Sequence, residues 1–146
     1  MYIFLDVDGV LNTTTDWKQK VYSLNPKCIE IFRSLINKLD NPKIVLSSTW
    51  RNGIARDGTT AIHIKDLLAA LNNPGGGNID KTAVSPDGIR SKEIDYYLRR
   101  HGRDKYIILD DDPTLFELGN KTPHLYLINP EKGITQNDIK KILKNI

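Results

Sequence analysis

Cysteine is nearly absent from this chain of 146 residues, which contains only Cys28. The lack of a second cysteine excludes an internal disulfide framework and a cysteine-based zinc cluster. Long hydrophobic runs are also lacking, since no stretch approaches the ~20 apolar residues that a membrane-spanning helix requires. Acidic residues interrupt the apolar N-terminal stretch, so we expect no secretory signal, no membrane partner and a cytoplasmic location. Without internal repeats or low-complexity linkers, we expect one domain over residues 1–146.

What the chain does contain is typical of a folded globular protein. Hydrophobic residues make up 39% and charged residues 27% of the sequence, which separates it from disordered chains. Its length is sufficient for one domain with a substantial core. The formal net charge is +3, a mild basic excess that suits a phosphate-bearing partner without requiring one.

Short apolar runs alternate with helical patterns along the chain. Apolar runs predict strands, and apolar residues spaced by three and four predict helices. The expected strands are residues 2–5, 43–46, 79–84, 106–109 and 124–129, and the expected helices are residues 26–39, 60–72, 91–100 and 135–143. This alternation predicts an α/β fold, a Rossmann-like three-layer α/β/α sandwich with a mainly parallel sheet.

Polar side chains follow three of the expected strands. These clusters are Asp6 and Asp8, then Ser47, Ser48 and Thr49, and finally Asp110, Asp111 and Asp112. The carboxyl ends of neighbouring parallel strands lie along one edge of a sheet, where ligands bind, so we expect the three clusters to meet. Side chains alternate along a strand, so the first two carboxylates project on the same side, where a cation or proton would relieve their repulsion.

Carboxylates without a nearby histidine or cysteine suit a hard cation, above all Mg²⁺. One carboxylate could attack phosphorus to form an aspartyl-phosphate, and a hydroxyl at the second strand end could donate to a phosphoryl oxygen. The alternative interpretation of the first cluster is a strand end followed by an Asx-type turn at Asp8 and Gly9.

With these motifs, the chain resembles the haloacid dehalogenase-like phosphohydrolases over nearly its whole length. Their first motif is a strand followed by DxDG[VT], and this sequence has FLDVDGVL. The resemblance implies that Asp6 is the nucleophile and Asp8 the general acid/base, with Gly9 next to the substrate. It also implies a Mg²⁺ cofactor bound by these two aspartates together with residues of the fourth motif.

The second and third motifs of the family each leave two candidates. The stretch KIVLS ends in Ser47, the expected phosphate contact, and Ser48 is the adjacent alternative. The stretch GIRSKEIDYYL offers Arg90 and Lys92 as the basic residue at a helix start. The family's spacing, with the basic residue four positions before an apolar one, fits Arg90 better.

The fourth motif is an apolar strand that ends in acidic residues, here YIILDDDPTLF. The form of this motif is similar to that of the family's capless protein phosphatases. The match implies Asp111 as a Mg²⁺ ligand and Asp110 as its support, whereas Asp112 before Pro113 is typical of a cap or turn.

A closer resemblance comes from the combination of LDVDGVL, LSSTWR, R-x-x-E-I and ILDDD. It is similar to the haloacid dehalogenase-type domain associated with bacterial and phage RNA-repair proteins. The gaps at residues 12–25 and 52–89 are too short for the family's cap domains, so we expect an open site. An open site favours a phosphatase for a large substrate, such as the 3′-phosphate of an RNA or DNA end. A nucleotide or small-metabolite phosphatase, a phosphoprotein phosphatase and a non-catalytic regulatory module remain alternatives.

Aromatic and basic residues near these motifs have two interpretations. Trp50 could stack on a base while Arg51 meets a phosphate. Alternatively, Trp50 packs under the following helix and Arg51 pairs with an acid. Trp17, Lys18 and Lys20 follow the first motif, where they could contact an anionic substrate or anchor a flap.

Overall fold

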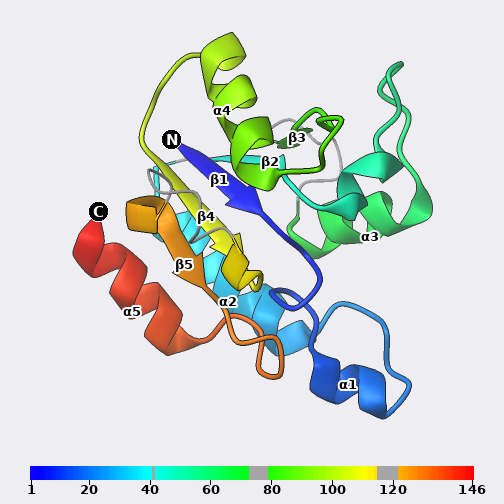
Figure 1. The fold of residues 1–146 in the computed structure, drawn as a ribbon. Helices are drawn as coiled ribbons and strands as arrows, with labels where there is room; N and C mark the ends of the chain where they lie inside the picture. Colours follow the sequence, from blue (N-terminus) through cyan, green and yellow to red (C-terminus); the bar gives the residue numbers. More distant parts are fainter. Residues whose placement is uncertain (41, 73–78, 115–121) are drawn as a thin grey trace.

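The computed structural model describes residues 1–40, 42–72, 79–114 and 122–146. Their strands form a five-stranded sheet in the order β3-β2-β1-β4-β5 (Figure 1). The strands are β1 (Tyr2–Leu5), β2 (Lys43–Leu46), β3 (Ile79–Lys81), β4 (Tyr106–Asp110) and β5 (Leu125–Leu127). All four pairings between neighbouring strands are parallel, which confirms the predicted α/β class.

Helices cover both faces of this sheet, as expected for three layers (Figure 1). The helices are α2 (Pro26–Lys38), α3 (Ile62–Ala70), α4 (Arg90–His101) and α5 (Gln136–Asn145). One core cluster joins alternate strand residues such as Leu5 to α2, α3 and α5. A smaller cluster joins the intervening residues, such as Phe4, to α4 on the opposite face. Alternation along each strand therefore decides which side chains face α4.

Short helical segments were not expected from the sequence. They are α1 (Thr14–Lys18), η1 (Thr49–Gly53) and η3 (Thr122–His124). The predicted strand 124–129 is shorter in the structure, because His124 lies in η3 with its ring stacked on Tyr106. Strand β3 is also shorter than the predicted 79–84. The Gly-rich stretch 74–78, which follows the predicted helix 60–72, lies outside the described residues.

The connections that could carry a cap domain are short in the described part of the chain. Between β1 and α2 the structure has α1, and between β2 and α4 it has η1, α3 and β3. Within the described ranges, neither connection builds a separate domain. None of the helices in those ranges has both the length and the apolar character needed to cross a bilayer.

Candidate functional site

Strand register places Asp6, Ser47 and Asp110 side by side. Leu5 of β1 pairs with the leucines that immediately precede Ser47 and Asp110 on the two neighbouring strands. The three polar residues therefore form one row at the carboxyl ends of the three central strands, β2, β1 and β4. Because side chains alternate, they project from the same face as Phe4, the face that α4 covers.

Three carboxylates gather at this edge. Oxygen atoms of Asp6, Asp110 and Asp111 all lie within 4.8 Å of one another. Arg90, in the first turn of α4, donates from one guanidinium nitrogen to both oxygens of Asp110, at 2.8 and 2.7 Å. The same nitrogen lies 3.5 Å from Asp6 Oδ2. The structure thus brings together the predicted nucleophile, two predicted metal-site residues and the candidate basic residue Arg90.

The crowding of these acids favours protonation of Asp6. Burial raises the pKa of Asp6 to about 9, and the charge of Asp110 and a hydrogen bond with Asp111 act in the same direction. Burial also raises the pKa of Asp110, although Arg90 opposes this change. The two carboxylates in turn hold the pKa of Arg90 above its usual value, despite the opposing effect of burial. One guanidinium is therefore not enough to offset the rise in pKa of Asp6 and Asp110.

The composition of the cluster fits Mg²⁺. With every group ionised, three carboxylates and one guanidinium leave two unbalanced negative charges, which a divalent cation would neutralise. All the side-chain donors are carboxylate oxygens, the ligands that Mg²⁺ prefers. Asp110 is already engaged, since its Oδ1 also accepts from the Asp112 backbone N–H at 2.9 Å. Asp6 and Asp111 are therefore the better candidates for direct ligands, with Asp110 in support.

Asp8 lies outside this cluster of carboxylates. Its Oδ1 accepts hydrogen bonds from Asn12 Nδ2 at 2.8 Å and from Trp50 Nε1 at 3.0 Å. Asn12 is itself fixed by the Gly9 backbone N–H, which donates to Asn12 Oδ1 at 2.9 Å. One oxygen of the Asp8 side chain is thus held by protein donors, and the role of Asp8 as a metal ligand remains a prediction.

Gly9 makes a close approach possible between the loop after β1 and the loop after β4. Its φ is +84°, and a Cβ at this position would collide with the carboxylate of Asp111. Any other residue would strain the backbone and displace a candidate metal ligand. Its role in the structure is to bring the two loops together, while its predicted substrate contact remains a prediction.

Two hydroxyls at the end of β2 are buried without a hydrogen-bond partner among the described residues: those of Ser47 and Ser48. Unpaired buried polar groups are costly, so a ligand at this point would offset that cost. The row across the sheet places Ser47 on the same side as Asp6. Register therefore favours Ser47 over Ser48 as the phosphate contact.

Arg51 has partners inside the protein. Its guanidinium makes two contacts with Glu93, at 2.6 and 3.3 Å, and a third with Thr82 Oγ1 at 2.9 Å. Of the two interpretations of Arg51, pairing with an acid is therefore the one that the structure contains. Lys92 is exposed and pairs with Asp87 at 2.6 Å, away from the acidic cluster.

Sequence reasoning missed the contributions of Asn12 and Glu93. The contact of Asn12 with Asp8 could have been predicted, because Asn12 ends the first motif in DGVLN and lies only four residues after Asp8. Glu93 belongs to the motif R-x-x-E-I, but the sequence did not indicate its pairing with Arg51, which lies 42 positions away.

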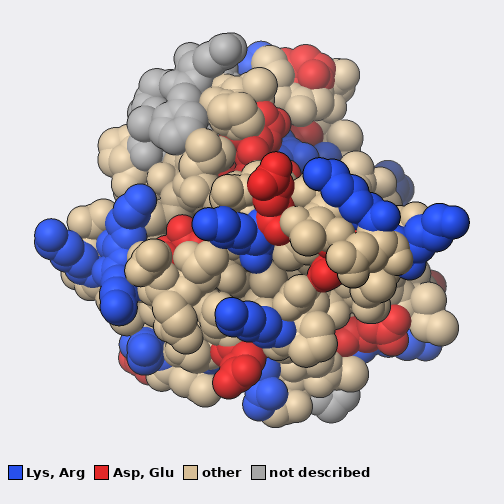
Figure 2. All heavy atoms as spheres, turned by 90° about the horizontal axis from the view of Figure 1, so that it is seen from below, with Lys and Arg blue, Asp and Glu red and all other residues tan. Residues whose placement is uncertain are grey.

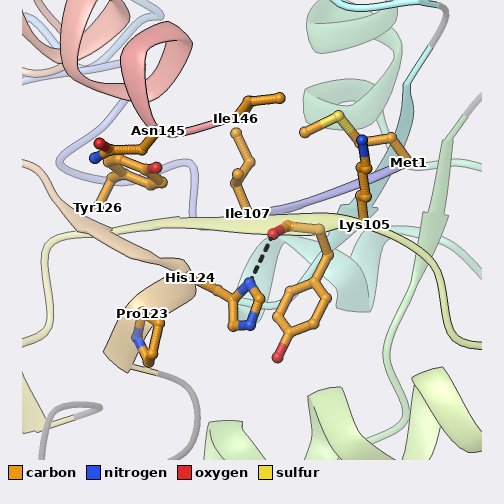
Figure 3. A pocket seen from close by; sticks show the side chains of 9 residues that line it. Met1, Lys105, Ile107, Pro123, His124, Tyr126, Asn145 and Ile146 are labelled. Atoms are coloured by element: carbon orange, nitrogen blue, oxygen red, sulfur yellow. Dashed lines mark hydrogen bonds between the residues drawn. The ribbon is translucent and has the colours of Figure 1, made fainter.

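A separate pocket of about 260 Å³ lies at the opposite edge of the sheet. Figure 3 shows Met1 and Lys105 at one end of it, Tyr126 and His124 toward the other, and Ile107 between them. His124 Nδ1 lies 3.2 Å from the Tyr106 backbone oxygen. These residues surround the amino ends of β1 and β4, so the pocket is not part of the acidic site.

The sheet order and the acidic carboxyl edge define a class, the Rossmann-like α/β domains with an acidic site at the carboxyl ends of the strands. Comparison with protein families narrows this class. The model of the haloacid dehalogenase (HAD) domain in Swiss Army Knife RNA repair proteins matches residues 2–139, and the chain belongs to this family. The match confirms the resemblance found in the sequence motifs and supports a phosphohydrolase-type function in general. No curated protein and no solved structure matches the chain.

Proposed function

We propose that this protein is a Mg²⁺-dependent phosphatase that acts through an aspartyl-phosphate on Asp6. The observation that carries the proposal is the row of Asp6, Ser47 and Asp110, with Arg90 and Asp111 in contact with it. Together these residues bring a carboxylate nucleophile, a hydroxyl donor and the candidate cation ligands Asp6 and Asp111 into one small area. Phosphoryl transfer by positioning and charge stabilisation needs these groups together.

The reaction proceeds in two displacements. In the first, an Asp6 oxygen bonds to phosphorus, the bond from phosphorus to the ester oxygen breaks, and Asp8 gives that oxygen a proton. In the second, Asp8 takes a proton from water as the water oxygen bonds to phosphorus. The bond between Asp6 and phosphorus then breaks, which releases inorganic phosphate and restores both aspartates.

The other residues hold the phosphoryl group and the charges around it. Ser47 donates its unpartnered hydroxyl to a phosphoryl oxygen. Arg90 fixes Asp110 and, through it, the acidic cluster. Bound Mg²⁺ supplies neutralisation of the carboxylates and of the phosphoryl charge, with Asp6 and Asp111 as its side-chain ligands.

We further propose that the substrate is a phosphate at a nucleic-acid end. Three observations favour it: the family's association with RNA repair, the net charge of +3 and the absence of a capping domain in the described ranges. Figure 2 shows Lys and Arg side chains around much of one face of the molecule, with acidic side chains between them.

A chromogenic aryl phosphate assayed with and without Mg²⁺ tests the activity. We expect turnover that requires Mg²⁺ and disappears in Asp6→Asn. A panel of 3′-phosphorylated oligonucleotides, nucleotides and phosphopeptides then tests the substrate class, with the oligonucleotides expected to be hydrolysed most efficiently. Turnover independent of Mg²⁺ and of Asp6 would contradict the mechanism, and absence of turnover on every substrate would favour a regulatory module.

A further inference from the structure

The hydrogen bond from Trp50 to Asp8 joins two elements at the site. Trp50 lies in η1, three residues after Ser47, and its indole N–H donates to Asp8 Oδ1 at 3.0 Å across 42 positions of sequence. Asn12 donates to the same oxygen at 2.8 Å. One carboxylate oxygen therefore has two protein donors, while Asp8 Oδ2 accepts no hydrogen bond from the described residues.

The indole ring is itself held firmly. Trp50 is partly buried and packs against the main core cluster. The ring of His63, from α3, meets it edge-on at 5.0 Å between centroids. Gly53 allows this arrangement, since a Cβ there would collide with His63 and Ile64. The ring is thus fixed by packing, and its only hydrogen-bonding group points at Asp8.

We propose that Trp50 is a positioning residue for the acid/base chemistry of Asp8. With Asn12, it fixes Asp8 through Oδ1, so that Oδ2 is the oxygen that gives a proton to the leaving group and takes one from water. This inference rests on the phosphatase function proposed above. The proposed role differs from base stacking and from simple packing, because the indole N–H of Trp50 orients Asp8, the residue that protonates the leaving group.

The leaving group provides the test. An alkoxide leaving from a nucleoside 3′-phosphate needs a proton, whereas a nitrophenolate is stable without one. General acid–base catalysis contributes about 10²–10⁴-fold, so Trp50→Phe, which keeps the ring but removes the N–H, should cost about tenfold in kcat/KM on the nucleoside phosphate. The kcat/KM for nitrophenyl phosphate should fall less than threefold.

Tyr97→Phe is the matched control. It also removes one aromatic donor to a carboxylate, since Tyr97 OH donates to Asp80 Oδ2 at 2.7 Å outside the site. We expect it to lower the melting temperature without altering the ratio between the two substrates. If Trp50→Phe likewise lowers the melting temperature and both rates in equal proportion, the positioning role is overturned.

A double-mutant cycle shows whether Trp50 acts through Asp8. In an Asp8→Asn background, Trp50→Phe should change the residual rate on the nucleoside phosphate less than twofold, because the acid is already missing. An undiminished tenfold loss in that background would overturn the proposal, since it would show that the indole acts elsewhere.

The hydrogen bond can also be observed without turnover. The chain has two tryptophans, so its NMR spectrum should show two indole N–H signals. We expect Asp8→Asn to move the Trp50 signal and leave the Trp17 signal in place. If Asp8→Asn moves the Trp50 signal but the wild-type protein hydrolyses no phosphate ester, the hydrogen bond exists and the phosphatase function is overturned. The catalytic role of Trp50 is then overturned with it. A protein that is active while its signal is unmoved would overturn the positioning role alone.

Discussion

Asp6 has surroundings that favour its protonated form, and this makes the metal-free protein sensitive to pH. The pKa of its carboxyl is about 9 in the fold against 3.8 in the unfolded chain, because of burial and its acidic neighbours. Between these two pH values Asp6 is protonated in the folded protein but ionised in the unfolded chain. The contribution of Asp6 to stability is thus complete below pH 3.8 and is lost as the pH rises toward 9.

We therefore expect the free energy of unfolding in EDTA to fall as the pH rises through this range. Urea denaturation at a series of pH values measures it. Asp6→Asn should flatten the dependence and match or exceed the wild type in stability near neutral pH. Mg²⁺ should stabilise the wild type more at pH 8 than at pH 5, since deprotonation precedes binding. A slope identical in the two proteins would show that Asp6 is not the responsible group.

Apart from Asp6, we expect Asp111 to contribute most to the affinity for Mg²⁺. Asp111→Ala should weaken Mg²⁺ binding about tenfold to a hundredfold, the loss typical of a disturbed metal site. Asp112→Ala is the matched control, because Asp112 Oδ1 accepts from the Thr114 backbone N–H and serves a turn. Isothermal titration calorimetry measures both. Unchanged binding in Asp111→Ala would refute its assignment as a ligand.

Single residues also show what could be predicted from the sequence. Asp6, Ser47 and Asp110 were identified correctly as neighbours, because strand ends in a parallel sheet share an edge whatever the details of packing. The partners of Trp50 and Arg51 could not be predicted. Each contacts a residue 42 positions away, so its role depends on tertiary structure rather than on a local pattern.

The ion pair of Arg51 and Glu93 connects two elements that carry the site. Arg51 belongs to η1, after β2, and Glu93 belongs to the first turn of α4, next to Arg90. Glu93 Oε1 also accepts from the Ser85 backbone N–H at 3.0 Å. The pair therefore attaches the start of α4 to the end of β2, and in this way it sets the position of Arg90.

Breaking this pair from one side should be strongly destabilising. Arg51→Met leaves the fully buried Glu93 carboxylate without its cation, which typically costs about 3–5 kcal/mol. The double variant Arg51→Met/Glu93→Leu should recover much of that loss, because no unpaired charge remains. Lys92→Met is the control, since it removes an exposed cation and should hardly change stability. Chemical denaturation measures all three, and equal stabilities of Arg51→Met and Lys92→Met would contradict the buried pairing.

Elements differed in how well the sequence predicted them. The core strands and α2 are apolar in a clear period, so their identity follows from local pattern. Helix α1 was missed because its local signal is small and part of its support is distant: Thr13 caps it, but Thr15 Oγ1 donates to the Glu131 backbone oxygen at 2.9 Å across 116 residues. A segment of five residues forms a helix only with such outside contacts.

At the scale of the whole molecule, the open edge of the sheet should favour a large substrate. A 3′-phosphorylated oligonucleotide should be hydrolysed with a higher kcat/KM than a mononucleotide. This advantage should shrink with added salt, by a slope of about 0.7 in log affinity per log salt for each phosphate contact. Steady-state kinetics from low to high ionic strength measure it.

Reversing the charge of lysines on α1 and in the loop after it tests whether these lysines contact the oligonucleotide. Lys18→Glu/Lys20→Glu should lower kcat/KM for the oligonucleotide and leave the mononucleotide nearly unchanged. Lys140→Glu/Lys141→Glu makes the same change of charge on exposed residues of α5 and should leave both rates nearly unchanged. Equal efficiency on both substrates, insensitive to salt, would favour a nucleotide phosphatase.

The central claim is that Asp6 carries the phosphoryl group during turnover. Rapid acid quench of the protein with substrate and Mg²⁺, followed by mass spectrometry of the peptide that contains Asp6, tests it most directly. The account predicts one added phosphoryl group on Asp6 in the wild type, and neither the adduct nor turnover in a folded Asp6→Asn variant. Turnover by Asp6→Asn within a few-fold of the wild type, or a phosphoryl group found on another residue, would contradict it.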